Sequence, residues 1–460
     1  MIKVFNHWFH RKTIAQITVD LMFPVVCVIL AAMWIGGGAH LEIGKVAFYA
    51  VIFTLIMIVF NVWLGIYQRV HSRTPEQTRA RAVLSLYLAI PLAYAVFALL
   101  SVAEVDRSFM LLSGLAALFA TLLRRVHSAH GHSGSLLSHR VLVFGVGEEA
   151  ENVGRVLRKS DPGIEIVGFY PCSTDTEIVV PAQVILSQEM SLSDTAHSLN
   201  VDEIIVAVRE RRGGALPLRE LLDCKLSGVK VLDLASYFER ALGQLRLDSL
   251  RVGWLIFGDG FRQSWRRSSV KRLFDIVVAL VLLLLAAPVM LLTALLIVLE
   301  DGCSIFYRQE RVGLDGRLFK VIKFRSMRND AEGDGKPRWA TLDDDRVTRV
   351  GRILRKLRID ELPQLYNVFA GDMSLVGPRP ERPYFVDQLT RDIPFYAVRH
   401  SVKPGLTGWA QVSYHYGSTV DDSVQKLQYD LYYVKNHSLF LDMVILFQTV
   451  GVVLTGKGAR

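Results

Sequence analysis

The residues best suited to chemistry are two adjacent carboxylates, Asp360 and Glu361. Neighbouring residues on a helix diverge by about 100°, so adjacent acids serve one site only where a helix has just begun or ended. Pro363 suits the start of a helix and Gly371 the residue past its last turn. We therefore predict a short helix over residues 362–370 with the acid pair at its entrance, where free N–H groups attract phosphate.

Two arginines flank this stretch, Arg358 just before the acid pair and Arg379 in the GPRPE turn that follows. A carboxylate pair beside an anion-binding helix start, with cations on both sides, is what phosphoryl chemistry at a divalent metal requires. An acidic cap on a surface helix is the alternative, and an isolated Asp-Glu pair favours that alternative. The motifs around the pair decide between the two.

Five motifs follow one another in the C-terminal part of the chain. They are RQERVGLDG at residues 308–316, FKVIKFRSM at 319–327, DDDRVTRVGRILRKLRIDELPQL at 343–365, GDMSLVGPRPE at 371–381 and KPGLTGWAQV at 403–412. Their order resembles the bacterial sugar transferase family, the polyprenyl-phosphate hexose-1-phosphate transferases or monotopic phosphoglycosyl transferases, from about Ser268 to Arg460. The resemblance implies transfer of a hexose 1-phosphate from a UDP-sugar to undecaprenyl phosphate, with release of UMP. This is the first membrane step of exopolysaccharide, capsule or O-antigen synthesis.

Within that reaction the residues provide a mechanism. Asp360 is expected to attack the phosphorus next to the sugar and expel UMP, after which the lipid phosphate takes the phosphosugar from the aspartyl ester. Glu361 and Asp360 are the expected ligands of Mg²⁺, the cofactor that would neutralise the diphosphate. The cations expected to bind the substrate are Lys323, Arg325, Arg358, Arg379 and Arg311.

Two charged runs near the acid pair allow more than one interpretation. Lys323 and Arg325 alternate with Phe324 in an extended run, so both charges share one face, which binds either a diphosphate or lipid head groups. Asp343–Asp345 include a DxD, which holds a metal in nucleotide-sugar glycosyltransferases. Because this run stands in a charged turn before Arg346, we expect it to form a loop.

Two other functions fit parts of the sequence. A membrane-anchored nucleotide-sugar dehydratase or epimerase shares the plan of four spans and a nucleotide-binding fold. Such enzymes need a Tyr-x-x-x-Lys pair, and no lysine in this chain has a tyrosine four residues before it. A non-catalytic scaffold for glycan assembly has no need of the acid pair or of five ordered motifs.

The composition places part of the chain in a membrane, because 51% of its 460 residues are hydrophobic. The net charge of +9 suits anionic lipid head groups and nucleotide substrates, and we find no nucleic-acid recognition module. The 4 cysteines lie far apart and form no CxxC pair. A disulfide framework or a zinc site is therefore not expected.

Four apolar stretches come first, at about residues 14–35, 46–66, 82–102 and 109–123. Basic residues gather before the first stretch, between the second and third, and after the fourth, so the positive-inside rule puts both ends of this region in the cytoplasm. Asp20 and Asn61 fall within these stretches. We expect both to form hydrogen bonds between helices.

A strand, a glycine turn and a helical pattern follow, in the run RVLVFGVGEEAENVGRVLRKS. The turn contains Gly145 and Gly147, the candidate nucleotide-binding residues of a fold that resembles a Rossmann domain. Further strands are expected at residues 164–170, 201–208 and 229–234. Because no acid ends the second strand to hold a ribose, we expect a degenerate structural domain in preference to a regulatory nucleotide site.

Residues 272–300 are long and apolar enough to span a membrane, but Pro288 at their middle cannot donate a helix hydrogen bond. Basic residues stand on both flanks, so both flanks are expected in the cytoplasm and the segment is predicted to be a re-entrant helical hairpin. Members of the family often have serine where this chain has Ala287. The stretch Ser438–Gly456 is expected to lie in the membrane interface or to pack on the hairpin.

The expected fold is that of a membrane protein with a four-helix transmembrane bundle, an α/β Rossmann-like cytoplasmic domain and a mainly helical monotopic catalytic domain. The expected boundaries are residues 1–127 for the bundle, 128–139 for a linker, 140–265 for the Rossmann-like domain and 266–460 for the catalytic domain. The front of the chain thus resembles the larger family members. We expect a multi-pass protein of the bacterial inner membrane with its catalytic domain on the cytoplasmic face. Its expected partners are a UDP-sugar, undecaprenyl phosphate and membrane lipids, without nucleic acid, and a homodimer is left open.

Overall fold

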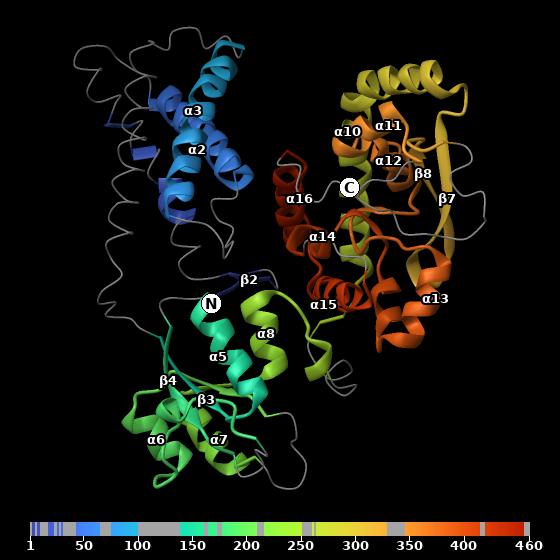
Figure 1. The fold of residues 1–460 in the computed structure, drawn as a ribbon. Coiled ribbons are helices and arrows are strands. Elements are labelled where there is room, and N and C mark those ends of the chain that lie inside the picture. Colours follow the sequence, from blue (N-terminus) through green and yellow to red (C-terminus); the bar gives the residue numbers. More distant parts are fainter. Residues whose placement is uncertain are drawn as a thin grey trace. The chain divides into compact units, whose positions relative to one another are not determined.

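The computed structural model describes residues 2–4, 7–9, 17–22, 25–26, 29–30, 43–64, 75–99, 139–160, 164–172, 177–208, 216–250, 260–261, 264–328, 346–414 and 419–454. The chain divides into two compact units. The first comprises Met1 and Phe9–Leu242, and the second comprises Ile2–Trp8 and Gly243–Arg460. The architecture is mixed α/β and mostly helical (Figure 1).

Two long helices of the first unit, α2 (Ile43–Trp63) and α3 (Pro75–Leu99), pack against each other. They coincide with the second and third apolar stretches. The hydroxyl of Ser85 on α3 donates a 2.7 Å hydrogen bond to the side-chain oxygen of Asn61 on α2, and both side chains are buried. The helix–helix hydrogen bond expected of Asn61 is therefore confirmed.

The described residues cover only part of the first predicted membrane stretch and none of the fourth. The first is described at residues 17–22, 25–26 and 29–30, which are helical. Asp20 on this stretch is buried. The fourth stretch and residues 128–138 of the predicted linker lie outside the described residues.

A four-stranded parallel sheet forms the other part of the first unit. Its strands are β3 (His139–Phe144), β4 (Ile164–Tyr170), β5 (Glu203–Val206) and β6 (Lys230–Asp233), in the order β4-β3-β5-β6. All four strands were predicted from the valine- and isoleucine-rich runs. The helices of this part are α5 (Glu148–Ser160), α6 (Leu192–Ser198), α7 (Leu218–Leu226) and α8 (Leu234–Leu242), with a 3-10 turn η1 at Ala182–Val184.

Both faces of this sheet are covered, as the apolar strands require. Leu142 and Phe144 of β3 point to a core shared with α6 and α7. Val141 and Val143, the alternate residues of the same strand, point to a core shared with α5 and α8. The result is a sheet between two helical layers.

The second unit contains α10 (Trp265–Asp301), a helix of 37 residues. Among the described residues it is the one helix long and apolar enough to cross a membrane, judged by length and composition. Its hydrogen-bonded helix continues past Pro288, and Figure 1 shows it changing direction before it reaches β7. The helix predicted for residues 272–300 is confirmed, while its placement in a membrane stays a prediction.

Apart from two helices of 17 and 16 residues, the remaining elements of the second unit are short. The strands β7 (Phe306–Val312) and β8 (Leu318–Phe324) form an antiparallel hairpin, and β9 (Ser374–Val376) pairs in parallel with β10 (Gly405–Thr407). β1 (Ile2–Val4) and β2 (His7–Phe9) form a separate two-stranded sheet. The helices are α11 (Arg349–Lys356), α12 (Gln364–Ala370), α13 (Pro383–Asp392), α14 (Trp409–Ser413), α15 (Val420–Asn436) and α16 (Leu439–Leu454). Short 3-10 turns are η2 (Leu247–Ser249), η3 (Leu314–Gly316), η4 (Ile359–Glu361) and η5 (Tyr396–Ser401).

The C-terminal helix α16 packs on the predicted hairpin. Leu441 and Ile445 of α16 lie in the same buried cluster as Ala279 of α10. Lys271 near the start of α10 also forms a 2.6 Å ion pair with the buried Asp442. α16 thus packs on α10, the segment predicted to form the hairpin; whether α10 is a hairpin in a membrane stays a prediction.

Candidate active site

The acid pair lies in the short turn η4, between α11 and α12. Arg358 has a φ of 59°, a left-handed conformation that turns the chain from α11 into η4. α12 begins just after Pro363, and Gly371 ends it with a φ of 103°. The predicted short helix is confirmed, but it begins two residues later than expected, because Leu362 still donates to Ile359 in the 3-10 pattern.

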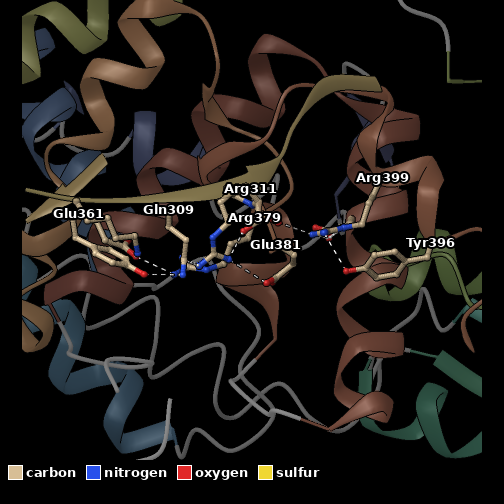
Figure 2. A network of polar contacts seen from close by, with 11 residues as sticks. Gln309, Arg311, Glu361, Arg379, Glu381, Tyr396 and Arg399 are labelled. Atoms are coloured by element: carbon tan, nitrogen blue, oxygen red, sulfur yellow. Dashed lines mark hydrogen bonds and ion pairs between the residues drawn. The ribbon is translucent and has the colours of Figure 1, made fainter. Parts of the chain in front are cut away.

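Three cations converge on the carboxylate of Glu361. The Nζ of Lys323 and a guanidinium nitrogen of Arg379 each lie 3.0 Å from Oε1, and Figure 2 shows the contact with Arg379. A guanidinium nitrogen of Arg358 lies 3.6 Å from Oε2. Burial alone would raise the pKa of Glu361, but the three cations outweigh burial and hold that pKa far below its usual range. Glu361 is therefore an anion at every pH of interest.

Asp360 has a different electrostatic environment, although it is the next residue. Its side chain is buried, and the residue is 9% exposed. Burial and the charge of Glu361 raise its pKa against the opposing charges of Lys323, Arg355 and Arg358, and the balance puts the pKa at about 6. Such a carboxylate is a stronger base than an ordinary aspartate and is still ionised at neutral pH. Neighbouring acids whose pKa values differ in this way can take different roles.

The strand that carries Lys323 is fixed by Asn367 of α12. The side-chain oxygen of Asn367 accepts from the backbone N–H of Ile322 at 3.0 Å, and its amide donates to the carbonyl of Lys320 at 2.9 Å. One side chain thus pairs with the free edge of β8 as a neighbouring strand would. Asn367 is 2% exposed. Sequence reasoning missed this residue, because its partners lie more than forty positions away and no local pattern marks them.

Arg379 reaches the site from the GPRPE turn, which follows β9. The backbone of Gly377 lies against β10, where its N–H donates to the carbonyl of Thr407 at 2.9 Å. A side chain on Gly377 would collide with the backbone of Lys403, so only glycine permits this approach. The glycine in this motif therefore serves the close packing of two backbones.

Two of the predicted substrate-binding arginines contact other partners. Arg325 donates at 2.7 Å to the carbonyl of Asp301, at the end of α10. Arg311 donates at 3.0 Å to the carbonyl of Pro380 and lies 3.5 Å from the carboxylate of Glu381. Of the five cations expected to bind substrate, the structure brings three to the acid pair, namely Lys323, Arg358 and Arg379.

The predicted glycine turn lies in the first unit, between β3 and α5. Gly145 has a φ of 120°, and a Cβ there would stand 3.0 Å from the carbonyl oxygen of Ala207, so the turn requires glycine. The next residue, Val146, is hydrogen-bonded through its carbonyl to the segment that follows β4. The carbonyl of Val146 accepts hydrogen bonds from the N–H groups of Val179 and Val180, at 3.0 and 3.3 Å.

The helix start beyond this turn is acidic. α5 begins directly after Gly147, and its first turn carries Glu148, Glu149 and Glu151. A helix N-terminus is equivalent to about half a positive charge, which three carboxylates outweigh. The charge next to Gly147 therefore opposes a bound diphosphate.

The donor set of the acid pair fits Mg²⁺. This ion prefers oxygen ligands and is commonly held by one or two carboxylates together with substrate phosphates and water. Asp360 and Glu361 offer such oxygens on adjacent residues. In the described part of the chain no group of three or more His, Cys, Asp or Glu side chains could hold a metal, so substrate oxygens and water would complete the coordination. Asp343–Asp345 lie outside the described residues.

Comparison with known proteins bears on this geometry. A model of the bacterial sugar transferase family matches residues 266–456. A UDP-N-acetylgalactosamine-undecaprenyl-phosphate N-acetylgalactosaminephosphotransferase of Aeromonas hydrophila is 46% identical over 53% of this chain and 56% of its own length. This chain thus spans little more than half of that relative.

Two other relatives match the front of the chain as well. A UDP-glucose:undecaprenyl-phosphate glucose-1-phosphate transferase of Xanthomonas campestris pv. campestris is 30% identical over 83% of both chains. A UDP-galactose-lipid carrier transferase of Erwinia amylovora is 31% identical over 69% of both chains. These two relatives match 83% and 69% of this chain, and the family model matches the region that contains the acid pair and its cations. The chain therefore belongs to the bacterial sugar transferase family.

Proposed function

We propose that this protein transfers a hexose 1-phosphate from a UDP-sugar to undecaprenyl phosphate and releases UMP, the first membrane step of a cell-surface glycan. The observation that carries the proposal is the acid pair, in which Asp360, with a pKa of about 6, stands beside Glu361 and its three cations. The named relatives act on different sugars, N-acetylgalactosamine, glucose and galactose. The proposal therefore leaves the sugar open.

In the first step an ionised oxygen of Asp360 attacks the phosphorus atom that carries the sugar. The bond from this phosphorus to the bridging oxygen breaks, and UMP leaves with that oxygen and its electron pair. Lys323 and Arg379 would hold the phosphate oxygens, since both already lie at hydrogen-bond distance from an anionic oxygen, that of Glu361.

In the second step a phosphate oxygen of undecaprenyl phosphate attacks the same phosphorus atom. The bond from phosphorus to Asp360 breaks, and the carboxylate is restored. A carboxylate with a pKa of about 6 suits both steps, because it is basic enough to attack and weak enough as a base to leave again.

Asp360 and Glu361 would hold Mg²⁺ together with the diphosphate, and the ion would neutralise charge on the phosphate oxygens. Glu361 keeps its negative charge beside three cations, so it also fixes their positions while the site is empty of substrate. The cations and the acid pair thus form a preorganised phosphate site.

The test uses the full-length protein in detergent with undecaprenyl phosphate, Mg²⁺ and a panel of UDP-sugars. We expect UMP from at least one sugar, and no UMP from the Asp360→Asn variant. UDP as the product would reject the proposal, because an ordinary glycosyltransferase breaks the bond between the sugar and the diphosphate. No release of either nucleotide from any sugar would also count against it.

We further propose that the chain is a multi-pass protein of the inner membrane in which α10 inserts as a re-entrant helix. Three observations support this: α10 is apolar and largely exposed, Pro288 stands within it, and basic residues flank it on both sides. A flank rich in arginine and lysine favours the cytoplasmic side. Both ends of α10 would then face the cytoplasm.

Single cysteines at Arg266 and Arg317, in a cysteine-free background, test this placement with membrane-impermeant thiol reagents. Both positions should react from the cytoplasmic side alone. Reaction of the Arg317 position from the outside would show that α10 crosses the membrane.

A further inference from the structure

The GPRPE turn is held at four consecutive carbonyl groups. The carbonyl of Pro378 accepts from the N–H of Gly405 at 2.9 Å, and that of Glu381 accepts from the N–H of Val312 at 3.0 Å. The two carbonyls between them, on Arg379 and Pro380, accept from arginine side chains. Both prolines of the turn also have a fixed φ. The backbone that carries Arg379 therefore has little freedom left.

One of these arginines is Arg399, which η5 contributes. A guanidinium nitrogen of Arg399 donates to the carbonyl of Arg379 at 2.9 Å. The same guanidinium group pairs with Asp430 of α15 through contacts of 2.7 and 3.0 Å, and a third nitrogen lies 3.3 Å from the hydroxyl of Tyr396. The side chains of Arg399 and Asp430 are 5% and 3% exposed. Arg399 is thus fully engaged inside the protein.

The other is Arg311 of β7. It donates to the carbonyl of Pro380 at 3.0 Å and to the side-chain oxygen of Gln309 at 2.6 Å, and it lies 3.5 Å from the carboxylate of Glu381. In the view of Figure 2, Arg311 and Arg379 lie next to each other, with Glu361 on one side of them and Arg399 on the other. In the hydrogen bonds and ion pairs given above, the guanidinium groups of Arg311 and Arg399 do not contact Asp360 or Glu361.

We infer that Arg311 and Arg399 are positioning residues, which fix the backbone of the GPRPE turn so that the guanidinium group of Arg379 is aimed at the phosphate site. The inference rests on the proposed function and assigns Arg311 a different role from the substrate contact expected from sequence. Arg379 lies 3.0 Å from Glu361, and a shift of its backbone would move the guanidinium group relative to the phosphate site. A displacement of about 1 Å at such a group costs about a hundredfold in rate.

A double-mutant cycle between Arg311→Gln and Arg379→Gln separates positioning from substrate contact. Each single variant should lower kcat/KM for UMP release by about tenfold to a hundredfold. If Arg311 acts through Arg379, then Arg311→Gln should cause no further loss in the Arg379→Gln background. Losses that multiply would show that Arg311 contacts the substrate itself and would overturn the inference.

The same double-mutant cycle is repeated with the affinity for UDP, determined by calorimetry, as the measured quantity. The result then does not depend on turnover. If no UDP-sugar gives UMP, the proposed function fails, while the binding cycle still tests the positioning. Arg311→Lys keeps one donor for the carbonyl of Pro380, so it should restore part of the loss. Arg391→Gln, an exposed arginine of α13, is the matched control and should leave both quantities unchanged.

The role of Arg399 is tested with a double variant, because Arg399→Gln alone would leave Asp430 buried without its cation. The variant Arg399→Gln with Asp430→Asn removes both charges. It should give the same loss of kcat/KM as Arg311→Gln, and no further loss when Arg379→Gln is added. A paired variant that is folded and fully active would remove Arg399 from the positioning role.

Discussion

Two parts of the chain carry patterns typical of phosphate binding, and their electrostatic environments are opposite. The glycine turn of the first unit leads into α5, whose first turn holds Glu148, Glu149 and Glu151. The helix entrance of the second unit has two carboxylates, and several cations surround them, namely Lys323, Arg355, Arg358 and Arg379. The glycine turn thus has acidic side chains at the helix start, whereas the acid pair has basic side chains around it.

The difference shows that backbone shape alone does not make a phosphate site. Gly145 has the left-handed conformation that a phosphate turn needs, yet Val146 is bonded to the segment that follows β4. At Glu361, by contrast, cations come from a strand, a helix end and a distant turn. Charged side chains that come together from distant parts of the sequence therefore distinguish the two regions.

The largest effect is expected from Asp360→Asn, which keeps the size of the side chain but removes the attacking anion. Turnover should fall by at least about a thousandfold, because no other group can take the phosphosugar. The measurement is UMP release with undecaprenyl phosphate present. Asp387→Asn, an exposed acid on α13, is the control. Turnover within tenfold of wild type would remove Asp360 from the reaction.

A smaller effect is expected from Lys323→Met, which deletes one of the three cations at Glu361. Loss of one preorganised charge contact should lower kcat by about a hundredfold. The variant Lys320→Met changes an exposed lysine on the same strand and is the matched control, since only its backbone carbonyl contacts Asn367. Equal losses in the two variants would mean that the effect comes from the strand and not from the charge.

The pH dependence of the first step should reflect Asp360. Its raised pKa of about 6 means that the carboxylate is ionised above that pH and protonated below it. Formation of UMP in a single turnover should therefore fall about tenfold per pH unit below pH 6. Glu361→Gln removes a neighbouring negative charge that raises this pKa, so in that variant the fall should begin at lower pH. An unchanged midpoint would contradict the coupling between the two acids.

The smallest effect is expected in the first unit. Neutralising Glu148 and Glu149 together, as Glu148→Gln and Glu149→Gln, should change UMP release by less than about twofold, since neither residue is among the groups whose charges act on Asp360 and Glu361 and salt screens exposed charges. NAD should not raise the melting temperature of the wild type. Stabilisation of the wild type by NAD would show that the first unit binds a nucleotide, and a tenfold loss of activity would show that Glu148 or Glu149 contributes to the transferase reaction.

Local patterns in the sequence predicted local structure well. The strands of the first unit followed from runs rich in valine and isoleucine, and the end of α12 followed from Gly371. The acid pair and Arg379 also followed, because motif order placed them together. These features depend on neighbours along the chain or on strong composition signals.

Long-range polar contacts could not be predicted in this way. Asn367 bonds to β8, and Arg399 to the carbonyl of Arg379, through side chains that leave no periodic trace in the sequence. Arg325 was expected at the substrate because it shares one face of an extended run with Lys323, and Arg311 was named with it; that pattern did not reveal their protein partners, the carbonyls of Asp301 and Pro380. α12 begins two residues later than predicted, because Leu362 still donates its hydrogen bond in a 3-10 pattern.

The central claim is that Asp360 carries the phosphosugar. Wild-type protein is mixed with Mg²⁺ and a UDP-sugar labelled in the β-phosphate, with no lipid acceptor, and quenched under conditions that preserve acyl phosphates. The account predicts one label on each active protein molecule and one UMP released for each label, with none of either for Asp360→Asn. UMP that forms only when undecaprenyl phosphate is present, with no label on the protein, would contradict it and would show direct attack by the lipid phosphate.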